Sequence, residues 1–244
     1  MTASLDFTFP VIAHRGASAF APENTLVSFS KAVQMGAKWL EFDVMLSADN
    51  EVIVFHDETL DRTTNGSGFV GNFPFSYLRT LDAGAWFDPA YSGERIPSLA
   101  QIATFLQEMK ISANIEIKSL PDQEQLTAQL AFKEILNYFP QRTDKILFSS
   151  FSVASLRELR RLSSECNLGL LMHDWQNDWD KICDELQCVS VHVNQQIMNP
   201  DRVHAIKNTH RQLLCYTVNN AHRAKELLSW GVDAIFSDIP TIIE

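Results

Sequence analysis

The sequence predicts an α/β protein that folds as a closed (β/α)8 TIM barrel with a small insertion, about 47–96, after the second strand. Short β-branched or apolar runs alternate with segments of helical period along the chain. Eight such runs with seven helical segments between them, within 244 residues, match the arithmetic of this barrel. The runs are 11–14, 38–44, 113–118, 146–150, 168–172, 189–193, 213–218 and 234–237.

The helical segments show apolar residues at helical spacing and N-terminal capping motifs. Leu26, Phe29 and Val33 share one face of the first helix, and Ser98 and Gln101 have capping-box spacing at the start of the second. The others run roughly over 122–139, 153–163, 178–187, 200–209 and 221–230. A doubly wound sheet is the alternative fold, but eight units favour closure and no Gly-rich dinucleotide motif follows the first strand.

One stretch breaks the alternation. A ninth apolar run, 52–56, follows the second strand too closely for a parallel crossover, so we expect an antiparallel hairpin that turns at Asp49–Asn50. This turn would place position 56 opposite position 43. Residues 57–96 show no clear helix and are rich in Gly, Asn, Ser and aromatic residues. We expect them to lie over the barrel mouth as part of one catalytic domain, residues 1–244, rather than to fold alone.

Composition and charge disfavour several classes of function and location. The net charge is −10 and the sequence pI about 5.1, which disfavours nucleic acid or an anionic membrane as the main partner. No apolar run approaches the ~18–20 residues that span a bilayer, and the first residues do not resemble a signal peptide. The four cysteines form no CxxC motif and are expected to be buried free thiols. These features predict a soluble, cytoplasmic protein.

The candidate catalytic groups stand at the carboxyl ends of the first strands, where barrel enzymes carry their active sites. Glu41 and Asp43 are two residues apart, so both carboxylates point to one face of their strand, and Glu116 and Lys118 share a face in the same way. The full set is His14, Arg15, Glu41, Asp43, His56, Glu116 and Lys118.

Three carboxylates that converge in a barrel mouth repel one another and raise each other's pKa values. One divalent cation would remove this repulsion, and all-oxygen ligation suits Mg²⁺ or Ca²⁺, with Mn²⁺ as a further candidate. Two histidines able to exchange protons near neutral pH and two fixed cations, Arg15 and Lys118, would stand beside it. This combination is typical of phosphoryl transfer.

Each signal alone has an ordinary structural explanation. An ExD pair on a strand is more often a solvated edge, and a His-Asp pair such as His56-Asp57 is usually a loop hydrogen bond. The occurrence of four such signals at one end of consecutive strands favours a functional site. His173 and His192 also lie near strand ends, but they are expected to be core or rim histidines.

Five motifs resemble the signature of the glycerophosphodiester phosphodiesterase family. They are His14-Arg15-Gly16, Pro22-Glu23-Asn24-Thr25, Glu41-Phe42-Asp43-Val44, His56-Asp57 and Glu116-Ile117-Lys118. Four further segments resemble the cytosolic bacterial subgroup: Asp174-Trp175, 188–192, 216–219 and 230–233. The likeness covers nearly the whole chain. Ser237-Asp238 replaces a more usual Thr-Asp, which is a mild change.

The resemblance implies a TIM barrel with a small insertion after strand two. It implies Glu41, Asp43 and Glu116 as metal ligands, His14 and His56 as the acid–base pair, and Arg15 and Lys118 as phosphate contacts. The implied reaction is hydrolysis of small-molecule glycerophosphodiesters, such as glycerophosphocholine or glycerophosphoethanolamine, to sn-glycerol 3-phosphate and an alcohol. Which histidine is the acid, whether water or the glycerol 2-hydroxyl attacks first, and the oligomeric state are left open.

Two other functions compete with this interpretation. A related barrel of the phospholipase type would act on acylated lipid phosphodiesters, but it would need an apolar or basic surface to meet a bilayer, and in most cases secretion. A catalytically dead barrel that serves as a binding module would have lost at least one histidine or carboxylate, and this sequence retains them all.

Overall fold

A closed ring of eight parallel strands forms the centre of the computed structural model, which describes residues 5–118, 120, 122–140 and 144–243. Each strand pairs with the next in chain order, and both β9 and β2 pair with β1, which closes the ring. The strands are β1 (Val11–His14), β2 (Trp39–Leu46), β4 (Ser112–Ile117), β5 (Ile146–Ser150), β6 (Asn167–Met172), β7 (Ser190–Asn194), β8 (Gln212–Tyr216) and β9 (Ala234–Ser237). The predicted TIM barrel is confirmed, and the doubly wound alternative is wrong.

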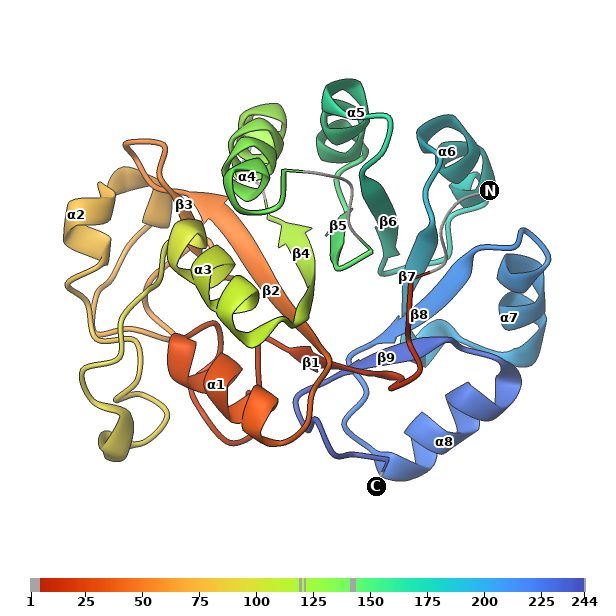
Figure 1. Ribbon diagram of the computed structural model, residues 1–244, viewed down its shortest axis with the longest axis horizontal. Coiled ribbons are helices and arrows are strands. Elements are labelled where there is room, and N and C mark those ends of the chain that lie inside the picture. Colours follow the sequence, from red (N-terminus) through yellow and green to blue (C-terminus); the bar gives the residue numbers. More distant parts are fainter. Residues whose placement is uncertain (1–4, 119, 121, 141–143, 244) are drawn as a thin grey trace.

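Helices surround this ring on the outside (Figure 1). They follow the strands in the predicted alternation: α1 (Leu26–Gln34), α3 (Leu99–Met109), α4 (Glu124–Tyr138), α5 (Val153–Leu162), α6 (Trp179–Leu186), α7 (Pro200–Lys207) and α8 (Ala221–Trp230). The capping box of α3 is present, since the Ser98 hydroxyl accepts from the Gln101 N–H and the Gln101 side chain accepts from the Ser98 N–H. The apolar faces of the helices pack against the strands and form the main core.

The antiparallel return after β2 is confirmed, but its predicted register is wrong by one residue. The short strand β3 (Val52–Val54) pairs with the end of β2, and the Phe55 N–H donates to the Asp43 carbonyl at 3.0 Å. Phe55, and not His56, therefore lies opposite Asp43. His56 follows the end of β3 and is not part of its ladder.

The turn explains this shift. Asn50 has a φ of 64°, in the left-handed region that asparagine tolerates better than most residues. The Ser47 N–H donates to the Glu51 carbonyl at 3.0 Å, so three residues rather than two connect the strands. A three-residue connection shifts every pair of opposite residues by one position compared with the predicted two-residue turn.

The insertion that follows β3 has a small apolar cluster of its own. It contains one short helix, α2 (Phe75–Leu78), and two 3₁₀ turns, η1 (Val70–Asn72) and η2 (Pro89–Tyr91); a third turn, η3 (Gln195–Ile197), follows β7. Its buried side chains pack on the β2–β3 hairpin. The Tyr91 hydroxyl donates to the Phe20 carbonyl at 2.8 Å, which ties the insertion to the β1–α1 loop. Figure 1 shows the insertion beside the hairpin at one edge of the molecule.

An apolar layer fills the amino-terminal half of the barrel interior. Trp39 of β2 packs there with Ile12, Leu147 and Phe236, and Leu5 belongs to the same cluster. Glu41 and Asp43 lie two and four residues further along β2, on the same face as Trp39. The carboxylates therefore stand closer to the carboxyl end of the barrel than this apolar cluster does.

The cysteines are free thiols, as the sequence predicts. Cys183, Cys188 and Cys215 are buried, but the expected burial of Cys166 is only partial. Among the described residues, no helix combines the length and apolar character needed to cross a membrane.

Candidate functional site

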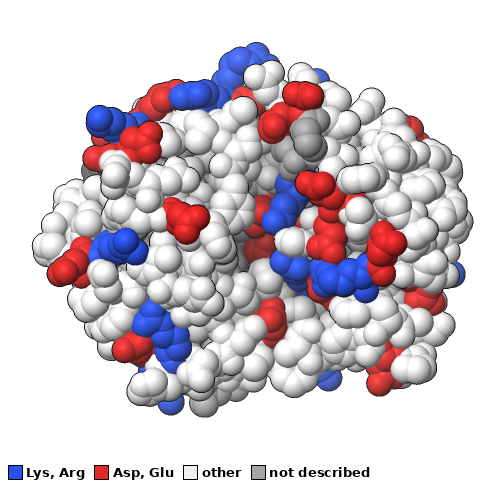
Figure 2. All heavy atoms as spheres, turned by 180° about the vertical axis from the view of Figure 1, so that it is seen from behind, with Lys and Arg blue, Asp and Glu red and all other residues white. Residues whose placement is uncertain are grey.

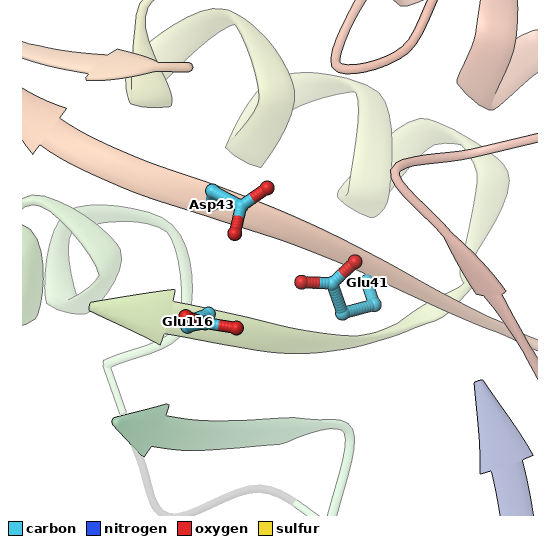
Figure 3. A group of neighbouring side chains, drawn as sticks. All are labelled: Glu41, Asp43 and Glu116. Carbon is cyan, nitrogen blue, oxygen red and sulfur yellow. The ribbon is translucent and has the colours of Figure 1, made fainter. Parts of the chain in front are cut away.

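Three carboxylates from two neighbouring strands meet at the mouth of the barrel (Figure 3). Glu41 and Asp43 come from β2, and Glu116 comes from β4, directly opposite Asp43 in the parallel register. One oxygen of each lies within 4.8 Å of an oxygen of the other two, and all three residues are buried. Such a set of oxygen ligands can hold a divalent cation.

Burial and mutual repulsion set the charges of these carboxyls. Burial, followed by the charges of Asp43 and Glu116, raises the pKa of Glu41 well above its usual range. Burial and the Asp43 charge also raise the pKa of Glu116. Burial acts to raise the pKa of Asp43 as well, but Arg15 and Lys118 hold it at about 2. A bound divalent cation would allow all three to ionise together, so the donor set fits the predicted metal.

Two cations lie against this acidic cluster. The Lys118 Nζ lies 2.8 Å from a Glu116 oxygen and 3.8 Å from an Asp43 oxygen. The Arg15 Nε lies 3.3 Å from Asp43 Oδ2, and its backbone N–H donates to Glu41 Oε2 at 2.9 Å. Both side chains therefore lie where they could also bind an anionic ligand beside the acidic cluster.

The backbone that carries Arg15 is strained. Arg15 has a φ of 54° and Gly16 a φ of 86°, so two successive residues occupy the left-handed region. A Cβ on Gly16 would lie 2.7 Å from the Ser28 backbone carbon, which excludes a larger residue. This tight turn after β1 directs the Arg15 N–H toward Glu41.

Each predicted catalytic histidine is held by a carboxylate at Nδ1. His14, opposite Glu41 in the sheet, lies with its Nδ1 2.7 Å from Asp238 Oδ1. The His56 Nδ1 lies 2.5 Å from Asp57 Oδ1. A carboxylate accepts a hydrogen bond from Nδ1–H, which leaves Nε2 as the nitrogen that can exchange protons. The His14 Nε2 lies 4.0 Å from Glu41 Oε2, at the edge of the acidic cluster.

Asp238 and Asn24 are not among the site residues that the sequence predicts. Asp238 follows the last barrel strand, and the strand-end rule applied to that strand would have identified it. It also accepts from the Ser18 hydroxyl and from the Asn219 amide. Asn24, buried with a φ of 57°, donates to Asp43 Oδ2 at 3.0 Å. Asn24 belongs to the Pro22–Thr25 motif, but the loop conformation that turns its side chain toward Asp43 leaves no periodic signal in the sequence.

The surroundings of His173 and His192 differ from those of the two predicted catalytic histidines. His173 is exposed, whereas His192 is fully buried in β7 and pairs with the Ser190 hydroxyl at 2.9 Å. Burial lowers the pKa of His192 to about 3, so the ring is neutral. His192 is thus a core histidine, as expected, and His173 is a rim histidine.

Two of the seven predicted residues, His56 and Lys118, line an open cavity. A cavity of about 350 Å³ is lined by Met45, His56, Asp57, Glu58, Lys118 and Leu120. Figure 2 shows acidic and basic side chains gathered beside a hollow near the middle of the face opposite to that of Figure 1. The site is therefore polar, of mixed charge and accessible to a small anionic molecule.

These groups, held at the carboxyl end of a closed parallel barrel, place the chain among the barrel enzymes. Residues 14–242 match the model of the Glycerophosphoryl diester phosphodiesterase family. The chain belongs to this family, and it is an enzyme of the phosphoric diester hydrolase class, as its sequence predicts.

Relatives and solved structures agree with this assignment. A glycerophosphodiester phosphodiesterase of Caldanaerobacter subterraneus subsp. tengcongensis is 34% identical over 94% of both chains. Another, of Bacillus subtilis, is 33% identical over 95% of this chain and 84% of its own. The structure of an Oleispira antarctica phosphodiesterase in complex with the product sn-glycerol-3-phosphate is similar with a TM-score of 0.91 and 36% identity, and covers 94% of this chain and 93% of its own.

Proposed function

We propose that this enzyme hydrolyses glycerophosphodiesters, glycerophosphocholine and glycerophosphoethanolamine among them, to sn-glycerol 3-phosphate and the free alcohol. The observation that carries the proposal is the convergence of Glu41, Asp43 and Glu116 oxygens within 4.8 Å, beside His14 and between two cations. The product bound to the Oleispira antarctica phosphodiesterase is the product expected of this reaction.

Glu41, Asp43 and Glu116 would hold one divalent cation, Mg²⁺ or Ca²⁺ in our proposal, with Mn²⁺ as a further candidate. The all-oxygen donor set supports hard cations over zinc. When bound, the cation would act as a Lewis acid that polarises the phosphoryl oxygen.

The protein's own side chains would perform the proton transfers and hold the phosphate. Because Asp238 and Asp57 occupy Nδ1 of His14 and His56, each ring would exchange its proton at Nε2. One imidazole would take the proton of the attacking nucleophile, water or the glycerol 2-hydroxyl, and the other would protonate the leaving oxygen. Arg15 and Lys118 would bind phosphoryl oxygens and stabilise the charge that develops in the transition state.

We further propose that the substrate is a free small molecule and that the enzyme works in the cytoplasm. Four free cysteines support a reducing compartment. The net charge of −10 gives no electrostatic attraction to an anionic bilayer.

The test is turnover of glycerophosphocholine by the purified protein, followed as release of sn-glycerol 3-phosphate in the presence of Mg²⁺, Ca²⁺ or Mn²⁺. We expect turnover with at least one of these cations and loss of turnover in the Glu41→Gln variant. Absence of turnover of glycerophosphodiesters by a folded protein saturated with each cation would contradict the proposal.

A further inference from the structure

Arg62 of the insertion bridges two carboxylates with its guanidinium group. Its Nε and Nη2 donate to the two oxygens of Asp57 at 2.6 and 2.9 Å. Its Nη1 and Nη2 donate to the two oxygens of Glu23 at 2.7 and 2.8 Å. Both edges of one planar group are therefore engaged in bidentate pairs, a geometry that lysine cannot reproduce.

The two carboxylates that Arg62 bridges also contact predicted site residues. Asp57 Oδ1 also bonds the Nδ1 of His56, and Glu23 Oε1 also accepts from Arg15 Nη1 at 2.7 Å. A continuous chain of charged hydrogen bonds thus runs from His56 through Asp57, Arg62 and Glu23 to Arg15. The Arg62 side chain is 45% exposed, and among the described residues its ion pairs are with Glu23 and Asp57, not with Glu41, Asp43 or Glu116.

The charges along this chain are complementary. Burial acts to raise the pKa values of Glu23 and Asp57, but the hydrogen bonds from Arg62 lower both, that of Asp57 to about 2. The two carboxylates, only 13% and 23% exposed at their side chains, remain ionised because a cation lies between them. Replacing Arg62 by a neutral side chain would leave two neighbouring anions without their common partner.

His56 and Arg15 need such a link because no strand pairing holds them together. His56 follows the end of β3, and Arg15 lies in the strained turn after β1. A displacement of about 1 Å between a proton-transfer group and the reacting atom can lower a rate 100-fold.

We propose that Arg62 is a positioning residue that fixes His56 relative to Arg15, through Asp57 on one side and Glu23 on the other. The inference rests on the proposed function, in which His56 moves a proton and Arg15 binds the phosphate. Arg62 touches neither the phosphate nor the reacting atoms; it acts through the two carboxylates.

The kinetic test separates the two sides of this link: the proton-transfer arm from Arg62 through Asp57 to His56, and the phosphate arm from Arg62 through Glu23 to Arg15. Asp57→Asn acts on the proton-transfer arm and should mainly lower kcat, whereas Glu23→Gln acts on the phosphate arm and should mainly raise KM. Arg62→Ala should do both, with kcat lower by about 10- to 100-fold. Arg62→Lys should recover only part of the loss, because an ammonium group cannot bond both carboxylates in bidentate fashion. Millimolar guanidinium, but not methylammonium, should partly restore the Arg62→Ala variant.

Arg157→Gln is the matched control, because Arg157 makes a similar bidentate pair with Glu185 on the exposed surface of α5. Its kcat and KM should equal those of the wild-type enzyme. Melting temperatures of all variants would show whether a loss of activity reflects unfolding. Unchanged kcat and KM in folded Arg62→Ala, or full recovery with Arg62→Lys, would overturn the inference.

A second readout does not depend on turnover. The ring ¹⁵N spectrum of His56 should show one Nδ1–H tautomer in the wild-type protein and a mixture of tautomers in Arg62→Ala, because Asp57 loses its fixed orientation. An unchanged His56 spectrum would overturn the inference. A wild-type protein without glycerophosphodiester turnover would instead overturn the proposed function, and the spectrum would still decide the role of Arg62.

Discussion

His14 and Asp238 are separated by 224 positions in the sequence, yet the His14 Nδ1 lies 2.7 Å from Asp238 Oδ1. The parallel register of β1 and β9 creates this contact, since Ala13 lies opposite Ser237 and His14 and Asp238 are the next residues along the chain. The end of the chain therefore sets the orientation of a histidine near its beginning. Closure of the barrel is therefore a condition of this contact.

Asp238→Asn should lower kcat by about 10²–10⁴-fold while the protein stays folded, because an amide no longer fixes the Nδ1–H tautomer of His14. Steady-state kinetics and a thermal melt measure this. Ser18→Ala removes another hydrogen bond to Asp238 and serves as the mild control. An Asp238→Asn enzyme with wild-type kcat would show that the carboxylate does not orient His14.

Removal of divalent cations should abolish activity, and added Mg²⁺ or Ca²⁺ should restore it. Glu41→Gln, Asp43→Asn or Glu116→Gln should each weaken metal binding by more than the roughly 10- to 100-fold typical of residues that only support a ligand. Calorimetric titration with the metal gives the affinities. Glu58→Gln changes an exposed carboxylate of the cavity that His56 and Lys118 line, and this variant should bind metal normally. Full activity in excess chelator would refute the metal assignment.

His14→Ala and His56→Ala should each lower kcat by about 10²–10⁴-fold, because each removes a general acid or base. Metal affinity should survive, since neither ring is proposed as a ligand. The exposed His173 provides the control, and His173→Ala should retain wild-type kcat. If His14→Ala or His56→Ala lost its metal but recovered full turnover on resaturation, the proposed roles would be wrong.

Deacylated substrates should be cleaved far faster than acylated ones. Trp86, Phe87 and Tyr91 of the insertion stack edge to face, and Tyr91 is tied to the β1–α1 loop. We propose that this aromatic group restricts the glycerol side of the mouth and leaves the alcohol side open. A parallel assay should give similar kcat/KM for glycerophosphocholine and glycerophosphoethanolamine, slow turnover of lysophosphatidylcholine and negligible turnover of phosphatidylcholine vesicles. Equal or faster cleavage of the lysolipid would favour the phospholipase interpretation.

Acid should destabilise the fold through His192. Because its pKa falls from about 6.5 in the unfolded chain to about 3 in the fold, only the unfolded chain takes up a proton between these values. The free energy of unfolding should therefore be unaffected by this group above pH 6.5 and fall by about 1.4 kcal/mol for each pH unit below it. Urea unfolding of wild type and His192→Gln at pH 7, 6 and 5 isolates this effect. Parallel pH dependence in the two proteins would contradict it.

Periodicity and the strand-end rule predict the barrel and all seven site residues in one place. The reason is that the parallel register converts sequence spacing directly into position: Glu41 and Asp43 share a face, and Asp43 lies opposite Glu116. The structure brings these residues together; their individual roles stay predictions.

Other details depend on information that no periodic pattern contains. The hairpin register follows from the left-handed conformation of Asn50, which adds one residue to the turn. The inward position of Asn24 depends on another left-handed residue in a loop. The link between Glu23 and Asp57 exists only because the insertion folds back on the β1–α1 loop and brings Arg62 between them.

The strand β2 is longer than the barrel requires. Residues 39–41 pair with β1, and residues 44–46, beyond the end of β1, pair with β3. The same rigid element thus carries Glu41 and Asp43 and forms the foundation of the insertion. A change in the insertion therefore need not displace the two carboxylates, because the hairpin ladder and the barrel ladder hold separate parts of β2. The support of the insertion and the support of the acidic cluster thus lie at successive positions along one strand.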